Sequence, residues 1–356
     1  MKTKYEKLMQ KCLILSKKSN GENLPNPYVA AIVFDEEKDE IVSLGYHKKF
    51  GESHAEVNAI KNANGNTKDK TLIVNLEPCS HYGKTPPCAD LIIKSGFKKV
   101  VVGMEDVNPI VKNKGIQKLK EAGIDVIVGV LKKECQELNK VFIKNMLEKK
   151  PYIMLKTATT LDSKIATIKG ESKWITDEFS RHEVQKLRSE YQAIMSASGT
   201  ILADNPRLNV RIKNKKSPIR IIFDPNNKIP LDYNVFNNDG IKKILINNKS
   251  GLILPPDTVQ MKFEGDFDEL FKNLYKSGIY SIMIEAGCKF NSLLLKAQET
   301  DEINHFIAPK IFGGGLNFVD NLEINEIKEA TELSDIKIKK LKNDILINAK
   351  ILKTTK

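Results

Sequence analysis

The sequence predicts an α/β protein built from two domains. Its 356 residues are more than one hydrophobic core of ordinary size requires. Short apolar runs, typical of buried strands, alternate with segments of helical periodicity along most of the chain. Between Glu148 and Pro151 a charged cluster meets a proline, and a new strand-like run follows at once. We therefore expect one domain over residues 1–148 and a second over residues 149–356.

The first domain is expected to open with a helix over residues 5–16, where apolar residues recur at helical spacing. A Pro-Asn-Pro turn at 25–27 separates this helix from a buried strand at 29–34. The strand at 41–45 is its expected hairpin partner. Beyond it we predict strands at 72–76, 100–103 and 124–128, and helices at 55–63, 88–94, 115–122 and 131–147.

The second domain shows the same alternation. A strand is expected at 152–158, directly after the boundary, and two closing strands over residues 335–352. Between them we predict strands at 193–196, 218–223, 243–246 and 281–285, and helices at 177–188, 267–276 and 291–297.

The net charge of +12 raises the question of a nucleic-acid partner. However, the lysines are scattered along the chain together with many Asn and Ile residues, and no dense basic tract is interleaved with aromatics. This pattern favours a general compositional bias over a nucleic-acid interface, and a basic surface also suits small phosphorylated substrates. We expect no nucleic-acid partner.

The five cysteines are an odd number in a long chain, which argues against a disulfide framework. No secretory signal is visible in the first 20 residues, and no apolar run approaches the roughly 20 residues of a membrane span. These features predict a cytoplasmic enzyme without membrane contact. Cys12, Cys135 and Cys288 lie in apolar or turn contexts and are expected to be packing residues.

A candidate zinc site lies in the first domain. His54, Cys79 and Cys88 supply three ligands of the types that zinc prefers, and Glu56 follows His54 by two residues. This His-x-Glu and Pro-Cys pattern is typical of zinc deaminases, in which zinc activates water and the glutamate, not itself a ligand, moves protons. The alternatives are a structural zinc site or unrelated core cysteines. Three ligands with a flanking glutamate favour the catalytic site.

Three polar residues near this pattern have two interpretations each. Asn26 serves either the turn geometry or hydrogen bonding to a substrate. His47 and His81 either contact a ligand or lie on the polar surface.

The second half contains no Gly-x-Gly-x-x-Gly after a strand, so a Rossmann cofactor site is not supported. Gly287, before a predicted helix, and the glycines of the 312–315 run either admit a phosphate or form turns. Arg188 and Arg211 are candidate phosphate ligands or solvated surface charges. Trp174 either stacks on a ligand or belongs to the core.

The motifs of both halves together resemble one family, the bifunctional deaminase/reductase of bacterial riboflavin biosynthesis. In the first half the resemblance rests on residues 76–81 (LEPCSH) and 84–88 (KTPPC), where eight residues separate the cysteines. In the second half it rests on residues 156–164 (KTATTLDSK), 170–176 (GESKWIT), 202–206 (LADNP), 285–287 (EAG) and 307–314 (IAPKIFGG).

The resemblance implies a cytidine-deaminase-like α/β/α layered domain followed by a dihydrofolate-reductase-like α/β domain. It implies one zinc ion per chain in the first and NADPH in the second. The implied substrates are 2,5-diamino-6-(5-phosphoribosylamino)pyrimidin-4(3H)-one for deamination and 5-amino-6-(5-phosphoribosylamino)uracil for reduction of its ribosyl group. It also implies a homo-oligomer, either a dimer or a tetramer.

Carried over residue by residue, the resemblance assigns further site residues. Asp204 or Glu285 is expected to assist proton movement. The residues expected to border NADPH are Ala158, Trp174, Thr200, Asp204, Gly287, Cys288, Lys289, Phe290, Asn291, Ser292 and Leu293. The residues expected to border a substrate are Asn26 in the deaminase half and Ser172, Arg188, Leu208, Arg211 and Glu285 in the reductase half.

Four positions depart from the family pattern. Ala30 and Ser163 replace glycines, Val107 replaces a proline, and Pro225 stands where a serine near the cofactor is common. A deaminase whose second half has lost its reductase activity, and a nucleic-acid-binding or editing protein, are the alternatives to the two-step enzyme.

Overall fold

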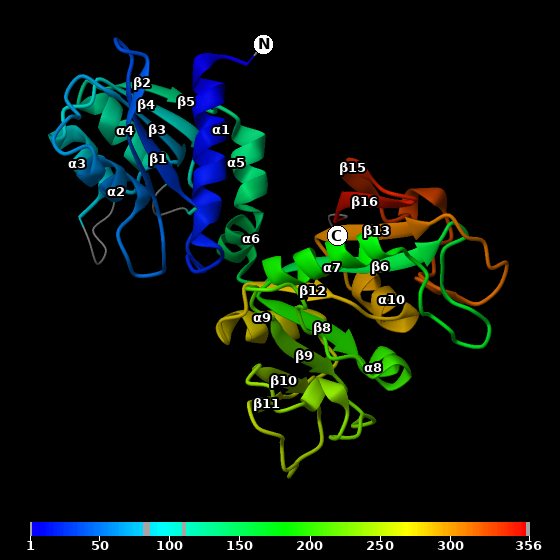
Figure 1. The fold of residues 1–356 in the computed structure, drawn as a ribbon. Coiled ribbons are helices and arrows are strands. Elements are labelled where there is room, and N and C mark those ends of the chain that lie inside the picture. Colours follow the sequence, from blue (N-terminus) through cyan, green and yellow to red (C-terminus); the bar gives the residue numbers. More distant parts are fainter. Residues whose placement is uncertain (1, 81–85, 109–111, 354–356) are drawn as a thin grey trace. The chain divides into compact units, whose positions relative to one another are not determined.

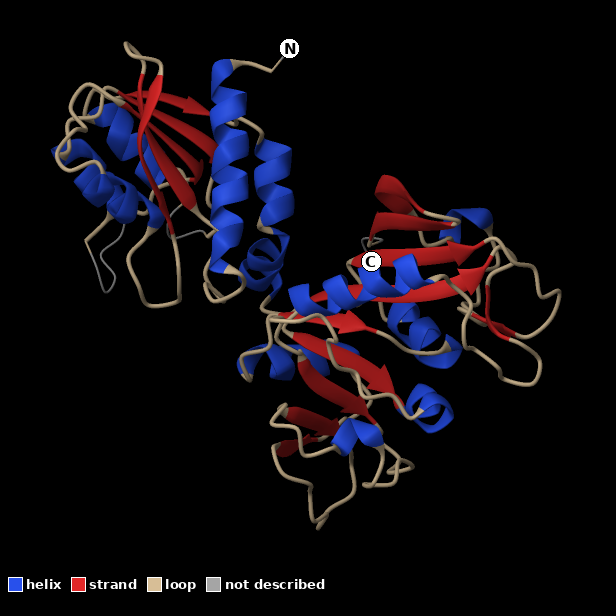
Figure 2. Ribbon diagram, in the orientation of Figure 1, coloured by secondary structure: helices blue, strands red, loops and turns tan. Residues whose placement is uncertain are grey.

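The computed structural model describes residues 2–80, 86–108 and 112–353. The chain forms two compact units, Met1–Lys149 and Lys150–Lys356, and each consists of a sheet flanked by helices (Figures 1 and 2). Within the described residues, no helix combines the length and the apolar character that a membrane crossing needs.

The first unit contains a five-stranded sheet in the order β2-β1-β3-β4-β5. Strand β1 pairs antiparallel with β2 and with β3, whereas β3, β4 and β5 run parallel. The predicted hairpin is thereby confirmed. The strands are β1 (Ala30–Asp35), β2 (Glu40–Tyr46), β3 (Thr71–Leu76), β4 (Lys99–Met104) and β5 (Asp125–Val128).

Helices cover both faces of this sheet, and the alternation along β1 explains why. Ala31 and Val33 face one apolar cluster with α2, α3 and α4, while Ile32 and Phe34 face another with α1 and α5. The expected three-layer α/β/α arrangement is confirmed. The helices are α1 (Lys4–Ser16), α2 (Ala55–Asn62), α3 (Cys88–Lys94), α4 (Lys114–Glu121), α5 (Lys132–Leu138) and α6 (Lys140–Glu148).

The single helix expected over residues 131–147 is wrong, because the chain forms two helices that meet at Asn139. The side chain of Asn139 accepts a hydrogen bond from the backbone N–H of Tyr28 at 2.8 Å and donates one to its carbonyl at 3.2 Å. Apolar periodicity continues across this position, so the break was invisible in the sequence pattern.

The second unit contains a nine-stranded sheet in the order β11-β10-β9-β8-β12-β6-β13-β16-β15. The first seven of these are parallel, and β16 and β15 add antiparallel pairs at one edge. The two closing strands were predicted. The strands of this sheet are β6 (Tyr152–Thr160), β8 (Ala193–Ala197), β9 (Ile219–Phe223), β10 (Lys243–Ile246), β11 (Thr258–Met261), β12 (Ser281–Ile284), β13 (Glu302–Ala308), β15 (Leu333–Leu341) and β16 (Asp344–Ile351).

Other elements of this unit were only partly predicted. Helix α10 begins three residues before the expected start, and α8, β11 and β13 were not predicted as elements. The small pair β7 (Lys164–Ala166) and β14 (Leu316–Asn317) forms a separate two-stranded sheet. The α-helices are α7 (Glu178–Glu190), α8 (Ser198–Asp204), α9 (Phe267–Lys276) and α10 (Cys288–Lys296). The described residues also form 3₁₀ turns at Lys17–Ser19, Asn234–Phe236 and Ile327–Glu329.

The arrangement of the parallel strands indicates where a site belongs. Parallel sheets bind ligands beyond the carboxyl ends of their strands, at the point where the chain's crossovers change direction. Here β12 lies between β8 and β6, so the segments after these strands share one edge of the sheet.

Ser163, which replaces a glycine of the family pattern, has a backbone φ of +65°, in the left-handed region. A side chain in that region costs about 1–2 kcal/mol, whereas glycine loses about 0.5–1 kcal/mol more backbone entropy on folding. Ser163→Gly is therefore expected to stabilise the second unit by about 0.5–1 kcal/mol, seen as a rise of its calorimetric transition by about 2 °C. Ser189→Gly within α7, where the backbone is helical, is the control and is expected to lower the transition. A fall in Ser163→Gly as well would contradict the strain argument.

Candidate functional site

Three ligand atoms converge in the first unit. The Nδ1 atom of His54 lies 3.6 Å from the Sγ atom of Cys79 and 3.3 Å from that of Cys88. All three atoms lie within 4.8 Å of one another. In a tetrahedral zinc site, Zn–S bonds of about 2.3 Å and Zn–N bonds of about 2.0 Å separate sulfur from nitrogen by about 3.5 Å. The donor set and its spacing therefore fit zinc.

Secondary structure brings these residues together. His54 directly precedes α2, Cys79 follows the carboxyl end of β3, and Cys88 is the first residue of α3. The backbone N–H of Cys88 donates to the Cys79 sulfur at 3.3 Å, and that of Ala89 donates to the Cys79 carbonyl at 3.1 Å. The long spacing between the cysteines thus still yields adjacent sulfurs. His81 lies outside the described residues.

The three ligand side chains shift one another's pKa values. A hydrogen bond with Cys88, supported by the His54 imidazole, lowers the pKa of the Cys79 thiol to about 4. The hydrogen bond with Cys79 raises the pKa of His54 to about 9. The hydrogen bond between Cys88 and Cys79, together with burial, raises the pKa of the Cys88 thiol. Cys79 is thereby the readiest anionic ligand of the set.

Glu56 stands beside this cluster in the first turn of α2 and is 3% exposed. Burial raises the pKa of its carboxyl group. A buried carboxyl with a raised pKa is suited to accept and return a proton near neutral pH. Among the described residues, the cluster comprises three ligands and leaves Glu56 outside it, which favours the catalytic interpretation over a closed structural site.

Asn26 and His47 form a chain of hydrogen bonds near His54. The Asn26 amide nitrogen lies 3.0 Å from His47 Nε2, and His47 Nδ1 lies 3.1 Å from the carbonyl oxygen of Ser53. Since a carbonyl only accepts, Nδ1 carries the proton and Nε2 accepts from the amide. The His47 ring meets the His54 ring edge-on, with centroids 5.8 Å apart. His47, for which the sequence left two interpretations open, is therefore a buried partner of Asn26.

In the second unit, several predicted residues meet at the carboxyl edge of the parallel sheet. Ala158 lies near the end of β6, Thr200 follows β8, and Glu285 and Gly287 follow β12. Gly287 caps α10 without a side-chain hydrogen bond. A Cβ atom on Gly287 would lie 3.3 Å from the Thr200 hydroxyl, so these two segments are adjacent.

A partly buried ion-pair cluster occupies the same edge. Arg188 Nε and Nη2 bind the two carboxylate oxygens of Glu285 at 2.6 and 2.8 Å, and Nη1 donates to the Asn209 carbonyl. The Arg188 fork, expected to be a phosphate ligand or a solvated charge, is thus bound to Glu285. Burial alone would raise the pKa of Glu285, but the charges of Arg188 and Lys156 outweigh it and lower the pKa to about 2.

Lys156 was not among the predicted site residues. Its ammonium lies 3.9 Å from the Glu285 carboxylate and 5.9 Å from the centre of the Phe306 ring, and burial lowers its pKa. A charged residue within the apolar run of a predicted buried strand was the signal that identifies it.

The remaining predicted residues differ in their contacts and in their exposure. Ser172 donates to Asp204 at 3.1 Å, and Trp174 is 62% exposed with the Arg181 guanidinium over its ring. Exposure shows that Trp174 is not a core residue. The others are mixed in exposure: Lys289, Leu293 and Arg211 are exposed, Cys288 is half-buried, and Leu208, Phe290, Asn291 and Ser292 are buried.

Phe290 and Asn291 have their side chains in the protein interior. Phe290 packs against Phe223 with ring centroids 4.7 Å apart, and the Asn291 amide donates to the Phe318 carbonyl. The side chains of both residues are therefore engaged in contacts within the protein.

The glycine run after Ile311 forms a packed turn. The backbone N–H groups of Phe312 and Gly313 donate to the Asp162 carboxylate, and a Cβ atom on Gly315 would lie 2.1 Å from the Ala166 carbonyl. Of the two interpretations of this run, the turn is the one that the structure shows.

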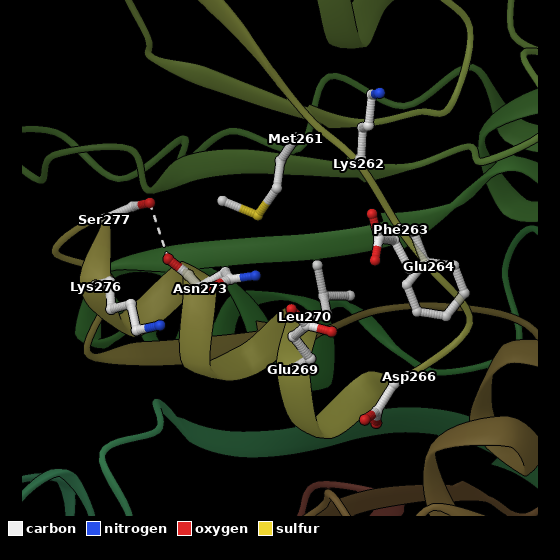
Figure 3. A pocket seen from close by; sticks show the side chains of 10 residues that line it. All are labelled: Met261, Lys262, Phe263, Glu264, Asp266, Glu269, Leu270, Asn273, Lys276 and Ser277. Carbon is white, nitrogen blue, oxygen red and sulfur yellow. Dashed lines mark hydrogen bonds between the residues drawn. The ribbon is translucent and has the colours of Figure 1, made fainter.

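A separate pocket lies between the end of β11 and helix α9 (Figure 3). None of its lining residues is a predicted site residue. They combine three carboxylates, two lysines, one amide and one hydroxyl with three apolar side chains: Met261, Lys262, Phe263, Glu264, Asp266, Glu269, Leu270, Asn273, Lys276 and Ser277.

Known proteins resemble both units. Residues 2–104 match the family model for the cytidine and deoxycytidylate deaminase zinc-binding region, and residues 151–347 match that for the RibD C-terminal domain. The riboflavin biosynthesis protein RibD of Aquifex aeolicus (strain VF5) is 42% identical over 345 residues, which cover 95% of this chain and 96% of that protein. RibD of Escherichia coli (strain K12) is 38% identical over 327 residues, covering 86% and 88%.

Solved structures agree over nearly the full length. The diaminohydroxyphosphoribosylaminopyrimidine deaminase/5-amino-6-(5-phosphoribosylamino)uracil reductase of Thermotoga maritima superposes with a TM-score of 0.87 at 36% identity, covering 98% of this chain and 99% of that one. Acinetobacter baumannii RibD gives 0.86 at 32% identity with the same coverage. The second unit thus has the expected dihydrofolate-reductase-like fold. This chain belongs to the RibD family of bifunctional riboflavin-biosynthesis enzymes, with a zinc-binding deaminase domain and an NADPH-dependent reductase domain.

Proposed function

We propose that the chain deaminates 2,5-diamino-6-(5-phosphoribosylamino)pyrimidin-4(3H)-one and then reduces the ribosyl group of 5-amino-6-(5-phosphoribosylamino)uracil. The Thermotoga maritima relative is named for both activities. The observation that carries the proposal is the convergence of His54, Cys79 and Cys88 beside the buried Glu56. The deaminase domain is proposed to be residues 1–148 and the reductase domain residues 149–356.

In the deaminase domain, His54, Cys79 and Cys88 would hold the zinc ion. When bound, zinc lowers the pKa of a ligated water toward about 7 and so supplies a nucleophile at neutral pH. Glu56 would accept the two protons of the attacking water in turn and pass one to the ring nitrogen and one to the departing amine, which leaves as ammonia. The raised pKa of Glu56 supports this exchange.

Asn26 orients the pyrimidine. Its amide nitrogen donates to His47, which leaves the amide oxygen to accept a hydrogen bond from an amino group of the substrate. The protonated Nδ1 of His47 is bound to the Ser53 carbonyl, so the orientation of the Asn26 amide is fixed before the substrate binds.

In the reductase domain, the substrate sugar reacts in its ring-opened imine form. When bound, NADPH would supply the hydride for the first sugar carbon, and the domain's own residues would have to provide the proton that the imine nitrogen gains. Glu285 stays ionised at neutral pH, because its pKa is about 2. We therefore assign Glu285 to charge stabilisation and Lys156, whose pKa is lowered by burial, to proton donation.

We place the cofactor at the carboxyl edge of the parallel sheet. Ala158, Thr200 and the backbone N–H groups at the start of α10 border NADPH. The first N–H groups of a helix have no partner within the helix, so they suit a phosphate. The side chains of Trp174 and Asp204 complete this surface, with Lys289 and Leu293 on the exposed side of α10. Ser172, Leu208 and Arg211 border the substrate with Arg188.

Arg188→Lys is expected to lower kcat/KM of the reductase by about 10–100-fold, because lysine cannot bind both oxygens of Glu285 and each lost charged hydrogen bond costs about 1.5–3 kcal/mol. NADPH oxidation at 340 nm measures it, with ammonia release as the internal control. An unchanged reductase rate would remove the Arg188–Glu285 fork from the mechanism. Lys186→Arg on the exposed face of the same helix is the matched control.

We further propose that the enzyme acts in the cytoplasm as a homo-oligomer, a dimer or a tetramer, without nucleic-acid or membrane partners. The scattered distribution of its lysines supports the absence of a nucleic-acid partner.

Incubation of the purified chain with the diaminopyrimidine phosphate, with and without NADPH, tests the whole proposal. We expect ammonia release in both cases and NADPH oxidation only after deamination. Ammonia release without NADPH oxidation would show that the second domain has lost its activity. No turnover, with tight and salt-dependent RNA binding, would favour a nucleic-acid enzyme instead.

A further inference from the structure

Glu77 is a buried carboxylate that the mechanism above does not use. It is 3% exposed and lies two residues before Cys79. Among the described residues, four backbone N–H groups donate hydrogen bonds to its oxygens. Oε2 accepts from Asp106 and Asn113, each at 3.0 Å, and Oε1 accepts from Gly115 at 3.0 Å and Ile116 at 3.3 Å.

These four bonds join three parts of the first unit. Asp106 follows β4, while Asn113, Gly115 and Ile116 form the start of α4. The first N–H groups of a helix have no partner within the helix, and they carry its positive end. Glu77 therefore accepts hydrogen bonds from the N–H groups at the amino end of α4. Its negative charge is favourable beside the positive end of the helix, and the side chain is buried from water.

A close backbone contact between Gly115 and Pro78 holds the same two segments together. A Cβ atom on Gly115 would lie 1.9 Å from the carbonyl oxygen of Pro78, so only glycine allows α4 to approach the chain this closely. Pro78 lies between Glu77 and Cys79, and its ring restricts the backbone. A displacement of Glu77 is therefore passed on to Cys79.

We propose that Glu77 is a positioning residue of the deaminase site: it fastens the Glu77–Pro78 segment to the first turn of α4 and thereby holds the Cys79 sulfur in place for the metal. The inference rests on the proposed zinc deaminase. Metal–ligand distances tolerate only about 0.2 Å, so a small displacement of the sulfur weakens the site. Loss of such a supporting contact costs about 10–100-fold in metal affinity or activity.

Glu77→Gln is the direct test, because the amide keeps the shape of the side chain but points N–H donors at backbone N–H donors. We expect zinc affinity, measured by competition with a chromophoric chelator, to fall about 10–100-fold. At saturating zinc we expect kcat for deamination to fall more than KM changes. In Co²⁺-substituted enzyme we expect altered sulfur-to-cobalt absorption. Glu121→Gln, the same change at the exposed far end of α4, should match the unsubstituted enzyme in all three.

Gly115→Ala provides an independent test, because it leaves the carboxylate in place but drives α4 away from Pro78. It is expected to weaken zinc binding in the same range, while NADPH oxidation with the aminouracil phosphate stays normal in both variants. Unchanged zinc affinity and cobalt spectrum in Glu77→Gln, or in Gly115→Ala where Glu77→Gln does not fold, would overturn the inference. Failure of the unsubstituted enzyme to bind zinc or release ammonia would instead overturn the proposed deaminase.

Discussion

Glu56→Gln is expected to keep its zinc and to lose deamination by a factor of about 10²–10⁴, the usual contribution of a positioned general acid–base. Glutamine has the size and shape of glutamate, so the packing at the first turn of α2 is preserved. It cannot accept the proton of the attacking water or return it to the leaving amine. Glu56 lies outside the three-ligand cluster, so the metal stays bound.

Ammonia release under saturating substrate measures this loss, and metal analysis of the same preparation measures zinc. Glu52→Gln, an exposed change two residues before His54, is the control and is expected to deaminate normally. Reduction of the aminouracil phosphate should be unaffected in both variants. Normal ammonia release by Glu56→Gln would exclude this carboxylate from proton transfer.

Cys88→Ala is expected to lose zinc and with it all measurable deamination. The substitution removes one of three protein ligands, and two ligands do not hold zinc against dilution. It also removes the partner that lowers the pKa of the Cys79 thiol, so the remaining sulfur is a poorer ligand at neutral pH.

Zinc content by atomic emission, alongside ammonia release, checks this result. Cys135→Ala is the matched control, because Cys135 is also a buried cysteine of the first unit but lies in the apolar cluster beneath α1. It is expected to keep zinc and activity at some cost in stability. Full zinc retention in Cys88→Ala would mean that Cys88 is not a ligand.

Elements with a strong local pattern were predictable from the sequence. Helix α9 and strand β10 were predicted with the bounds that the structure has, because both combine a clear period with turn residues on either side. The break at Asn139 and the short helix α8 were not predictable. They depend on tertiary hydrogen bonds and on the loops around the sheet edge, which leave no period in the sequence.

The zinc cluster could be predicted from the sequence because its residues lie in short, chemically distinctive motifs. The residues at the carboxyl edge of the second unit's sheet were harder to predict, for a physical reason. Sequence alone offers Arg188 as a free cation, whereas the fold places it against Glu285, more than 90 positions later in the chain. Phe290 likewise falls within the proposed cofactor segment, yet its ring faces the aromatic cluster around Phe223. The direction of a side chain is decided by tertiary packing, and a sequence motif carries no information about that packing.

The placement of β6 has a consequence for how the polypeptide is made. This strand lies between β12 and β13, and its register pairs Tyr152 with Ser281 and Met154 with Glu302. During synthesis, β6 therefore emerges from the ribosome long before either neighbour exists, whereas β1 meets β2 within a few residues. The zinc-binding half is able to reach its native pairing during translation, while the other half carries an unpaired apolar strand edge until late in elongation, the state in which nascent chains depend most on chaperones.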